Sequence, residues 1–228
     1  NYIEKCKLIF RYIFMKYLEK TKDVNLQTYA SLFSNSLWIA TSISALLVNR
    51  CNQSVISEYR TFYENFIILS YLKKHPELIE AYNDHFTVCS YKVGIEYGKI
   101  KTPQEIDESQ YLKIIEKYGK SFSEDYGWMS LIEKNHLKRN LETMFKESDL
   151  HDAYSALYKH ACKFTHSTSY SVHFKPDYEF LIQFIIALVG LLKQQFNFLF
   201  DNLKMVTKEK EILRAFIEIL SDNIIQRF

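Results

Sequence analysis

The stretch SEYRTFYENFIILSYLKK, residues 57–74, has the apolar spacing of an α-helix. One stripe follows the i, i+3, i+4, i+7 pattern and consists of Tyr59, Phe62, Tyr63, Phe66 and Leu69. Ile67, Ile68 and Tyr71 extend the apolar character to a second face. The pattern predicts a helix buried on two sides, as expected for a central helix of a helical protein.

The composition of the chain favours long helices throughout. Of 228 residues, 47% are apolar and 25% are charged, which is the balance of a globular protein. There are five Gly and three Pro residues, whereas the many short strands of a sandwich or barrel need frequent turn residues. We therefore predict an all-α fold, a single multi-helix bundle over residues 1–228. Helices are expected at about 3–20, 26–50, 54–74, 76–99, 108–118, 128–147, 150–165, 177–202 and 208–226.

Charge, cysteines and hydropathy limit the partners and the compartment. The formal net charge is +2, so any contact with nucleic acid has to be local. The four cysteines show no paired spacing of a zinc or redox site, and no metal or cofactor is expected. No signal-peptide pattern is visible, which leaves the cytoplasm as the expected compartment. The apolar stretches LWIATSISALLV and FLIQFIIALVGLLKQQFNFLF are too short or too interrupted for spans, so we expect buried helices and no membrane contact.

Arg60 and Glu64 lie one turn apart on the flank that the central helix shares with Ile67 and Tyr71. One interpretation is an ordinary surface pair at i, i+4, worth a few tenths of a kcal/mol. The other is an interior charge pair that reaches the Tyr158–His166 segment and positions another polar group.

The stretch YKHACKFTHSTSYSVHF, residues 158–174, is the most polar part of an otherwise amphipathic region. An apolar stripe is expected from Tyr154, Tyr158, Ala161, Cys162 and Thr165. Lys159, Lys163 and His166 fall near one flank, while His160 points nearer to Leu157 and Phe164. The lysines would favour a neutral His166, the form that can accept a proton from a hydroxyl. The alternative is a structural histidine bonded to a carbonyl at the end of the helix.

Three segments in order, RTFYENFIILSYL, DYGWMSLI and YSALYKHACKFTHSTS, resemble a bacterial family of unknown function. The resemblance covers about residues 30–200, and its pattern falls on Arg60, Glu64, Trp128, Tyr154, Tyr158, His166 and Ser167. That family is all-helical and distantly similar to HEPN domains, which include ribonuclease toxins, phage-defence proteins and inert members. In the HEPN ribonuclease motif an Arg and a polar residue precede the His; here Lys159, His160 and His166 have the spacing, with Lys in place of Arg.

Other chemistries have weaker support, since glycine-rich phosphate loops, HExxH pairs and G-x-S-x-G elbows do not occur. A Cys162–His166 thiolate pair is possible by spacing, but a buried, inert thiol is the simpler reading. A metal centre of His160, His166, His173 and Glu64 lacks the spacing of helical ligand pairs.

Two functions therefore remain open. The first is an RNA-directed stress or phage-defence effector, a metal-independent ribonuclease with His166, Lys159 and His160 as catalytic residues. Arg60, Glu64, Tyr158 and Ser167 would support that site. The second is a non-catalytic module that binds a partner protein or a small ligand through the same pocket. A homodimer is compatible with both.

Overall fold

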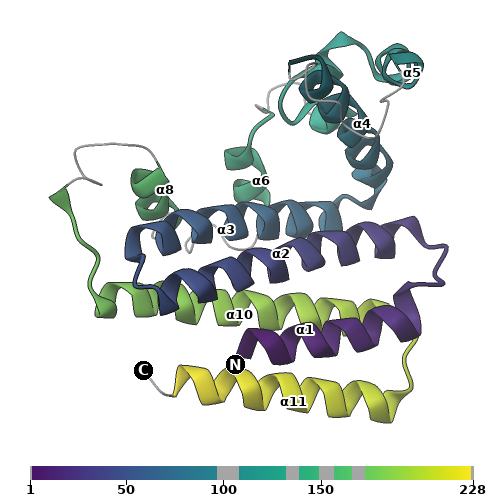
Figure 1. Ribbon diagram of the computed structural model, residues 1–228. Helices are drawn as coiled ribbons and strands as arrows, with labels where there is room; N and C mark the ends of the chain where they lie inside the picture. Colours follow the sequence, from purple (N-terminus) through teal and green to yellow (C-terminus); the bar gives the residue numbers. More distant parts are fainter. Residues whose placement is uncertain (1, 97–107, 132–138, 149–156, 166–172, 227–228) are drawn as a thin grey trace. The chain divides into compact units, whose positions relative to one another are not determined.

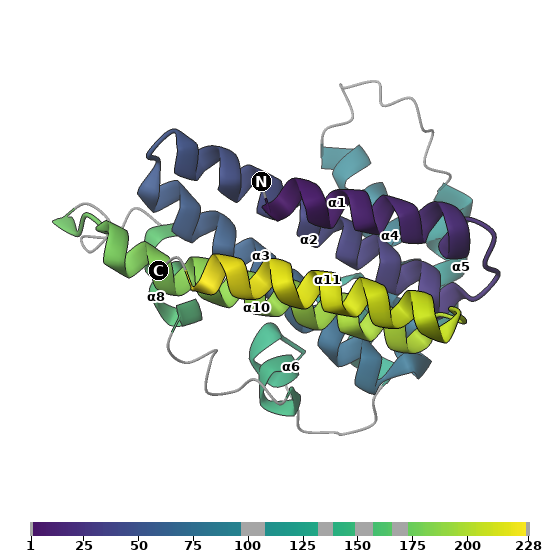
Figure 2. The same ribbon diagram turned by 90° about the horizontal axis from the view of Figure 1, so that it is seen from below.

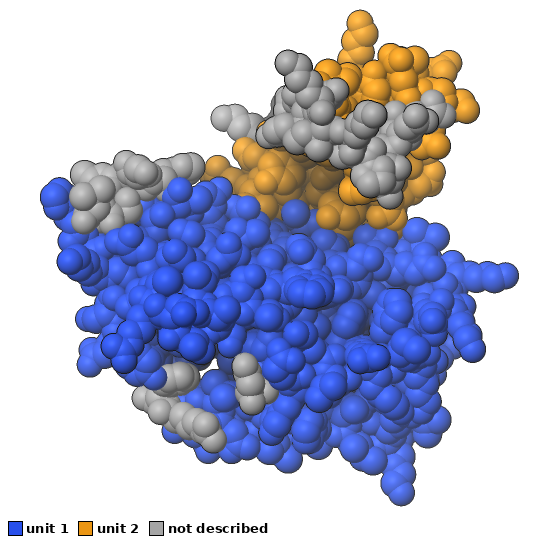
Figure 3. Space-filling model, viewed as in Figure 1, with its two compact units in different colours: residues 1–70, 149–228 blue, residues 71–148 orange. Residues whose placement is uncertain are grey.

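The computed structural model describes residues 2–96, 108–131, 139–148, 157–165 and 173–226. All regular structure in these residues is helical, and no strand occurs among them, so the predicted all-α class is confirmed. The chain forms two compact units, one of residues 1–70 with 149–228 and one of residues 71–148 (Figure 3). The prediction that residues 1–228 form one domain stays a prediction.

Unit 1 contains long helices that run alongside one another (Figures 1 and 2). Its elements are α1 (Tyr2–Ile13), the π-helix η1 (Phe14–Leu18), α2 (Val24–Val48), α3 (Asn52–Lys74, up to Ser70), α8 (Lys159–Thr165), α10 (Tyr178–Asn202) and α11 (Thr207–Ile225). Capping residues begin two of them: Asp23 accepts hydrogen bonds from the first amides of α2, and Asp177 accepts one from the amide of Phe180 in α10.

The core of unit 1 is built from aromatic side chains on α2, α3 and α10. The Phe33 and Phe196 rings meet edge to face at 4.6 Å, and Tyr59 meets Phe184 in the same way at 5.0 Å. Buried Asn65 of α3 donates to the Leu32 carbonyl of α2 at 2.7 Å and to the Ser36 hydroxyl at 2.8 Å. These contacts fix α3 against α2 and α10, as expected for a central helix.

Two helices of unit 1, α2 and α10, are long and apolar enough to cross a membrane by length and composition. The core helices of soluble proteins meet the same criterion, and both helices are partly buried, with Phe33 and Phe196 in the core. The cytoplasmic location and the expectation of no membrane contact stay predictions.

Unit 2 holds the last turn of α3 and shorter helices. These are η2 (Pro76–Leu78), α4 (Ile79–Glu96), α5 (Glu108–Tyr118), η3 (Lys120–Ser123), η4 (Gly127–Leu131) and α6 (Leu141–Glu147). Trp128 is buried, with its ring edge to face with Tyr82 at 5.3 Å and with Tyr71 at 6.0 Å. The tryptophan segment of the family pattern is therefore part of a core.

The expected continuous helix at 128–147 is wrong for the residues that the structure describes. The 3₁₀ turn η4 begins at Gly127, where a Cβ atom would lie 2.0 Å from the carbonyl oxygen of Phe122. A new helix, α6, then begins after Asn140, whose side chain accepts a hydrogen bond from the Thr143 amide at 3.0 Å. Among the described residues this region therefore holds two short elements, η4 and α6, instead of one continuous helix.

The other boundaries differ by smaller amounts. The first α-helix ends at Ile13 and continues as π-helix to Leu18, so the expected helix 3–20 is not α-helical along its whole length. The expected helix 76–99 begins as a 3₁₀ turn at Pro76–Leu78, before α4. In the expected helix 150–165, residues 157–158 are π-helical and α8 begins at Lys159, whereas 149–156 lie outside the described residues.

Candidate functional site

The predicted two-sided burial of α3 is confirmed. Tyr59, Phe62 and Tyr63 are buried on one side, and Ile67 and Tyr71 are buried on the second. Arg60 and Glu64 lie on the flank between these faces, and their side chains are 25% and 26% exposed. The pair is therefore partly enclosed, between the two alternatives of a solvated surface pair and a fully interior one.

Glu64 joins α3 to the start of the α8 region. Its Oε1 accepts a hydrogen bond from Arg60 Nε at 2.8 Å and another from the Tyr158 hydroxyl at 2.5 Å. The Arg60 guanidinium carbon lies 5.9 Å from the centre of the Tyr158 ring, and Tyr63 packs on that ring at 6.1 Å. We call Arg60, Glu64 and Tyr158 the Glu64 cluster. The expected contact between the Arg60–Glu64 pair and the Tyr158 segment is present.

Burial favours the protonated forms of the Tyr158 phenol and of the neighbouring Cys162 thiol. Burial is the main reason that the pKa of Tyr158 is raised above its usual value, and the Glu64 carboxylate adds to the effect. The pKa of Cys162, one turn further on, is also raised, mainly by burial. A raised pKa disfavours the thiolate form, so Cys162 is poorly suited to be the nucleophile of a Cys–His pair.

Helix α8 turns its basic residues to solvent. Lys159, His160 and Lys163 are exposed, and the two lysines are one turn apart at i, i+4. The His160 ring lies 6.1 Å from Phe180 of α10, edge to face. The structure therefore places Lys159 and His160 next in sequence to Tyr158 but on the outer side of the helix.

The buried face of α8 corrects one detail of the expected stripe. Ala161 and Phe164 are buried, Cys162 is half-buried and Thr165 is exposed. Phe164 and Thr165 follow Ala161 by three and four residues, and helical spacing allows either of them to share its buried face. Phe164 takes the inward position that was expected for Thr165.

His166 and Ser167, the remaining predicted site residues, lie outside the described residues, as does Tyr154. The roles of all seven predicted residues stay predictions. Among the described residues, no group of three or more His, Cys, Asp or Glu side chains could hold a metal ion. The metal centre considered above includes His166 and so extends beyond the described part of the chain.

Three polar residues of α3 that the sequence analysis did not select also hold the region around α8. Ser57 donates to the Phe164 carbonyl at 3.2 Å, Gln53 to the Phe174 carbonyl at 3.3 Å, and Asn52 to the Pro176 carbonyl at 3.0 Å. Gln53 and Ser57 share a face with Arg60 and Glu64, at spacings of four, three and four residues. A polar stripe on a largely buried helix was the feature of the sequence that could have indicated these contacts.

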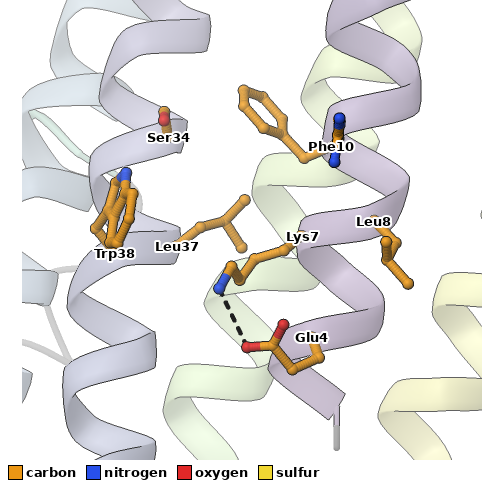
Figure 4. A pocket seen from close by; sticks show the side chains of 8 residues that line it. Glu4, Lys7, Leu8, Phe10, Ser34, Leu37 and Trp38 are labelled. Atoms are coloured by element: carbon orange, nitrogen blue, oxygen red, sulfur yellow. Dashed lines mark hydrogen bonds and ion pairs between the residues drawn. The ribbon is translucent and has the colours of Figure 1, made fainter.

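A separate groove of about 290 Å³ lies between α1 and α2 in unit 1 (Figure 4). Lys7 Nζ lies 5.7 Å from the centre of the Trp38 ring and 3.1 Å from the Glu4 carboxylate. An adjoining hollow of about 720 Å³ shares Phe10, Arg11, Ser34 and Trp38 with it. None of the predicted site residues line either hollow, so the groove is not part of the α8 region.

Comparison with models of known protein families gives a match. The model of a family of unknown function, DUF5677, matches residues 27–179, more than half of the chain. The matched range includes α2 from Gln27 onward, α3, α8 and the whole of unit 2, and ends at the second residue of α10. No curated protein and no solved structure matches the chain. The resemblance to a family of unknown function is thus confirmed, with a slightly different range, and the similarity to HEPN domains stays a prediction.

Proposed function

The chain belongs to the DUF5677 family of unknown function, and on that premise we propose that it is an RNA-directed effector with its site on and after α8. The observation that carries the proposal is the exposure of Lys159, His160 and Lys163 on a helix that contains no acidic residue. Such a face attracts phosphate groups locally, although the net charge of the chain is small.

The Glu64 cluster supports this proposal as a scaffold. Tyr158 immediately precedes the basic residues, and its hydroxyl is held by a carboxylate on a buried helix. Ser57 fixes the other end of α8 through the Phe164 carbonyl. Two contacts to one rigid helix limit the movement of α8, and a fixed cation stabilises a developing charge better than a mobile one.

The proposed reaction is cleavage by the RNA's own 2′-hydroxyl. His166 takes the proton of that hydroxyl, the oxygen attacks the adjacent phosphorus, and the bond to the 5′-oxygen breaks. Lys159 contacts the phosphate, and His160 supplies the proton to the leaving 5′-oxygen. The products are a 2′,3′-cyclic phosphate and a 5′-hydroxyl, and the reaction requires no metal. We place this activity in the cytoplasm of a bacterium, in a stress or phage-defence response.

A second candidate function is supported by the closed hydrogen bonding of the cluster. Glu64 already accepts from Arg60 and Tyr158, and the raised pKa values keep Tyr158 and Cys162 protonated. None of these groups is poised to exchange a proton. The same scaffold would suit a non-catalytic module that presents the basic face of α8 to a partner protein or a small anionic ligand.

The test uses a single-stranded RNA carrying a fluorophore, incubated with the purified chain in the presence of EDTA. We expect cleavage to cyclic phosphate ends, loss of cleavage in His166→Ala, and weaker RNA binding in Lys159→Ala. Lys159→Arg should bind at least as tightly as the native chain, because a guanidinium contacts phosphate with a two-pronged donor. Lys204→Ala, an exposed lysine beyond the end of α10, is the matched control and should behave like the native chain.

The outcomes separate the two candidates. Binding that depends on Lys159 without any cleavage would favour the non-catalytic module. The absence of both binding and cleavage, with the fold intact by circular dichroism, would contradict an RNA-directed function.

A further inference from the structure

Helices α1 and α11 form a pair at the surface of unit 1 (Figures 1 and 2). The Tyr2 hydroxyl lies 3.2 Å from the Ser221 hydroxyl, and the Tyr12 hydroxyl donates to Glu209 at 2.6 Å. The start of α1 therefore lies beside the end of α11 and the end of α1 beside its start, so the two helices are antiparallel. Both helices lie outside residues 27–179, the range of the family match. The pair is therefore a feature of this chain beyond the matched family region.

Each helix of the pair exposes an apolar stripe in addition to its buried face. On α11 the buried residues include Ile217 and Leu220, while Ile212, Phe216 and Ile219 are 59%, 43% and 59% exposed. The exposed set has the i, i+4, i+7 spacing of one helix face, the spacing of successive d, a and d positions in a heptad. This helix is apolar on two sides, although unit 1 covers only one of them.

Apolar side chains are also exposed on the neighbouring N-terminal segment. They are Leu8 and Tyr12 of α1, which are four residues apart, and Met15 in the π-helix η1 that follows. Leu8 also lines the groove that α1 forms with α2, so this stripe adjoins that groove (Figure 4). The Tyr12 hydrogen bond to Glu209 places the stripe at the boundary with α11. Together the six side chains form what we call the α1–α11 surface.

The charges on α11 indicate what would cover this surface. Ala215 is close to the midpoint of the Ile212–Ile219 stripe. Lys208 lies seven residues before Ala215, and Asp222 lies seven residues after it. Both are exposed, and neither side chain has an ion pair within the part of the chain that the structure describes. When two copies of such a helix pack antiparallel about that midpoint, each lysine approaches the aspartate of the other copy.

We infer that the chain forms a symmetric dimer through the α1–α11 surface, with α11 antiparallel to α11 of the second copy. The arrangement is closed, because one two-fold axis near Ala215 satisfies both apolar stripes and both charge pairs at once. It brings two α1 helices to the flanks, where Leu8 and Tyr12 extend the apolar contact. The inference does not depend on the proposed RNA-directed function.

A second copy fits this surface better than an anionic membrane does. Amphipathic helices that bind anionic lipids carry mainly lysine and arginine beside their apolar face. Here exposed Glu211 and Asp222 lie on the same helix as Lys208, so the mixed charge would be partly repelled by an anionic lipid surface. In an antiparallel pair of α11 helices, by contrast, Lys208 of each copy lies opposite Asp222 of the other, so the mixed charges are complementary.

The experiment measures the mass of the full chain by sedimentation and by light scattering after gel filtration. Over a range of about 1 to 100 µM we expect a mass near twice 27.2 kDa at the upper end. Phe216→Glu should give a monomer with unchanged helical content. Val48→Glu, at an exposed valine at the end of α2, is the matched control and should leave the dimer intact.

Charge reversal tests the antiparallel arrangement without changing the apolar contact. Lys208→Glu or Asp222→Lys alone should weaken the dimer about tenfold, since each creates two like-charge contacts. The double variant Lys208→Glu with Asp222→Lys should recover the native dissociation constant, because the pairs are reformed with opposite sign. These exposed substitutions also serve if Phe216→Glu fails to fold.

Several results would overturn the inference. These are a native chain that is monomeric at about 100 µM, a dimer that persists in Phe216→Glu, or a double charge variant that is weaker than either single one. Binding of the monomer to vesicles of phosphatidylglycerol and phosphatidylcholine would assign the surface to lipid instead.

Discussion

Removal of the Glu64 carboxylate gives a direct measure of how far the cluster is enclosed. Glu64→Ala loses the hydrogen bond from Tyr158, which at 2.5 Å to a charged acceptor is worth about 1.5 kcal/mol at the low end of its class. It also loses the pair with Arg60, worth about 0.5 kcal/mol for an i, i+4 pair that water partly screens. We expect the free energy of unfolding to fall by about 2 kcal/mol.

This value lies between two limits. A fully buried pair that loses one partner costs about 3 to 5 kcal/mol, and an exposed pair costs about 0.5 kcal/mol or less. The 25% and 26% exposure of the two side chains places the cluster between them. Tyr158→Phe should cost about 1.5 kcal/mol, and the double variant with Glu64→Ala should cost little more than Glu64→Ala alone, a coupling of about 1.5 kcal/mol.

The assay is urea unfolding followed by far-ultraviolet circular dichroism, with a check that the slope against urea is unchanged. Lys146→Ala is the control, since it breaks an exposed i, i+4 pair with Glu142 and should cost about 0.5 kcal/mol or less. The reasoning is refuted if Glu64→Ala costs no more than the control, or if the effects of Glu64→Ala and Tyr158→Phe are additive.

Three further predictions concern other contacts of the fold. Gly127→Ala should destabilise the chain by about 3 kcal/mol or more, because the new Cβ would lie 2.0 Å from a backbone oxygen. Gly190→Ala has no atom near its new Cβ and should stabilise α10 by about 0.5 to 1 kcal/mol. Thermal melts of both variants test this pair of predictions. Asn65→Ala should cost about 2 kcal/mol in urea unfolding, because the amide donates to two acceptors on α2. The pKa of Glu209 is lowered to about 2, chiefly by its hydrogen bond with Lys16. The stabilising effect of the Glu209 carboxylate is therefore present above about pH 4.5 and is lost as the pH falls toward 2. Between these pH values the melting temperature of Glu209→Gln should fall less than that of the native chain.

The centre of the fold was predictable because its pattern is local. Tyr59, Tyr63, Ile67 and Tyr71 repeat at helical spacing, and the two buried faces that they predict are those of α3. The contact of Glu64 with Tyr158 was also accessible, since a charge pair on a two-sided helix needs a polar partner. Both inferences start from side chains of α3, whose phase is set by one uninterrupted helix.

Errors arose where spacing allows more than one choice or where a contact of the folded chain decides. Phe164 and Thr165 lie three and four residues after the buried Ala161, and the spacing alone does not show that Phe164 is the one that turns inward. The start of η4 at Gly127 involves a close fit beneath the Phe122 carbonyl, which is a contact within the folded structure. A sequence pattern contains the glycine but not the oxygen that excludes a side chain.

The geometry of the Glu64 cluster also limits where chemistry can occur. A carboxylate that accepts from a guanidinium and a phenol has partners for its charge, and the phenol is protonated by the effect of burial. Such a group positions its neighbours and does not transfer protons itself. If the chain acts on RNA, proton transfer falls to His160 and His166, and Glu64→Ala should reduce activity and stability together. His166→Ala would then reduce activity alone, so comparing the two variants separates positioning from chemistry.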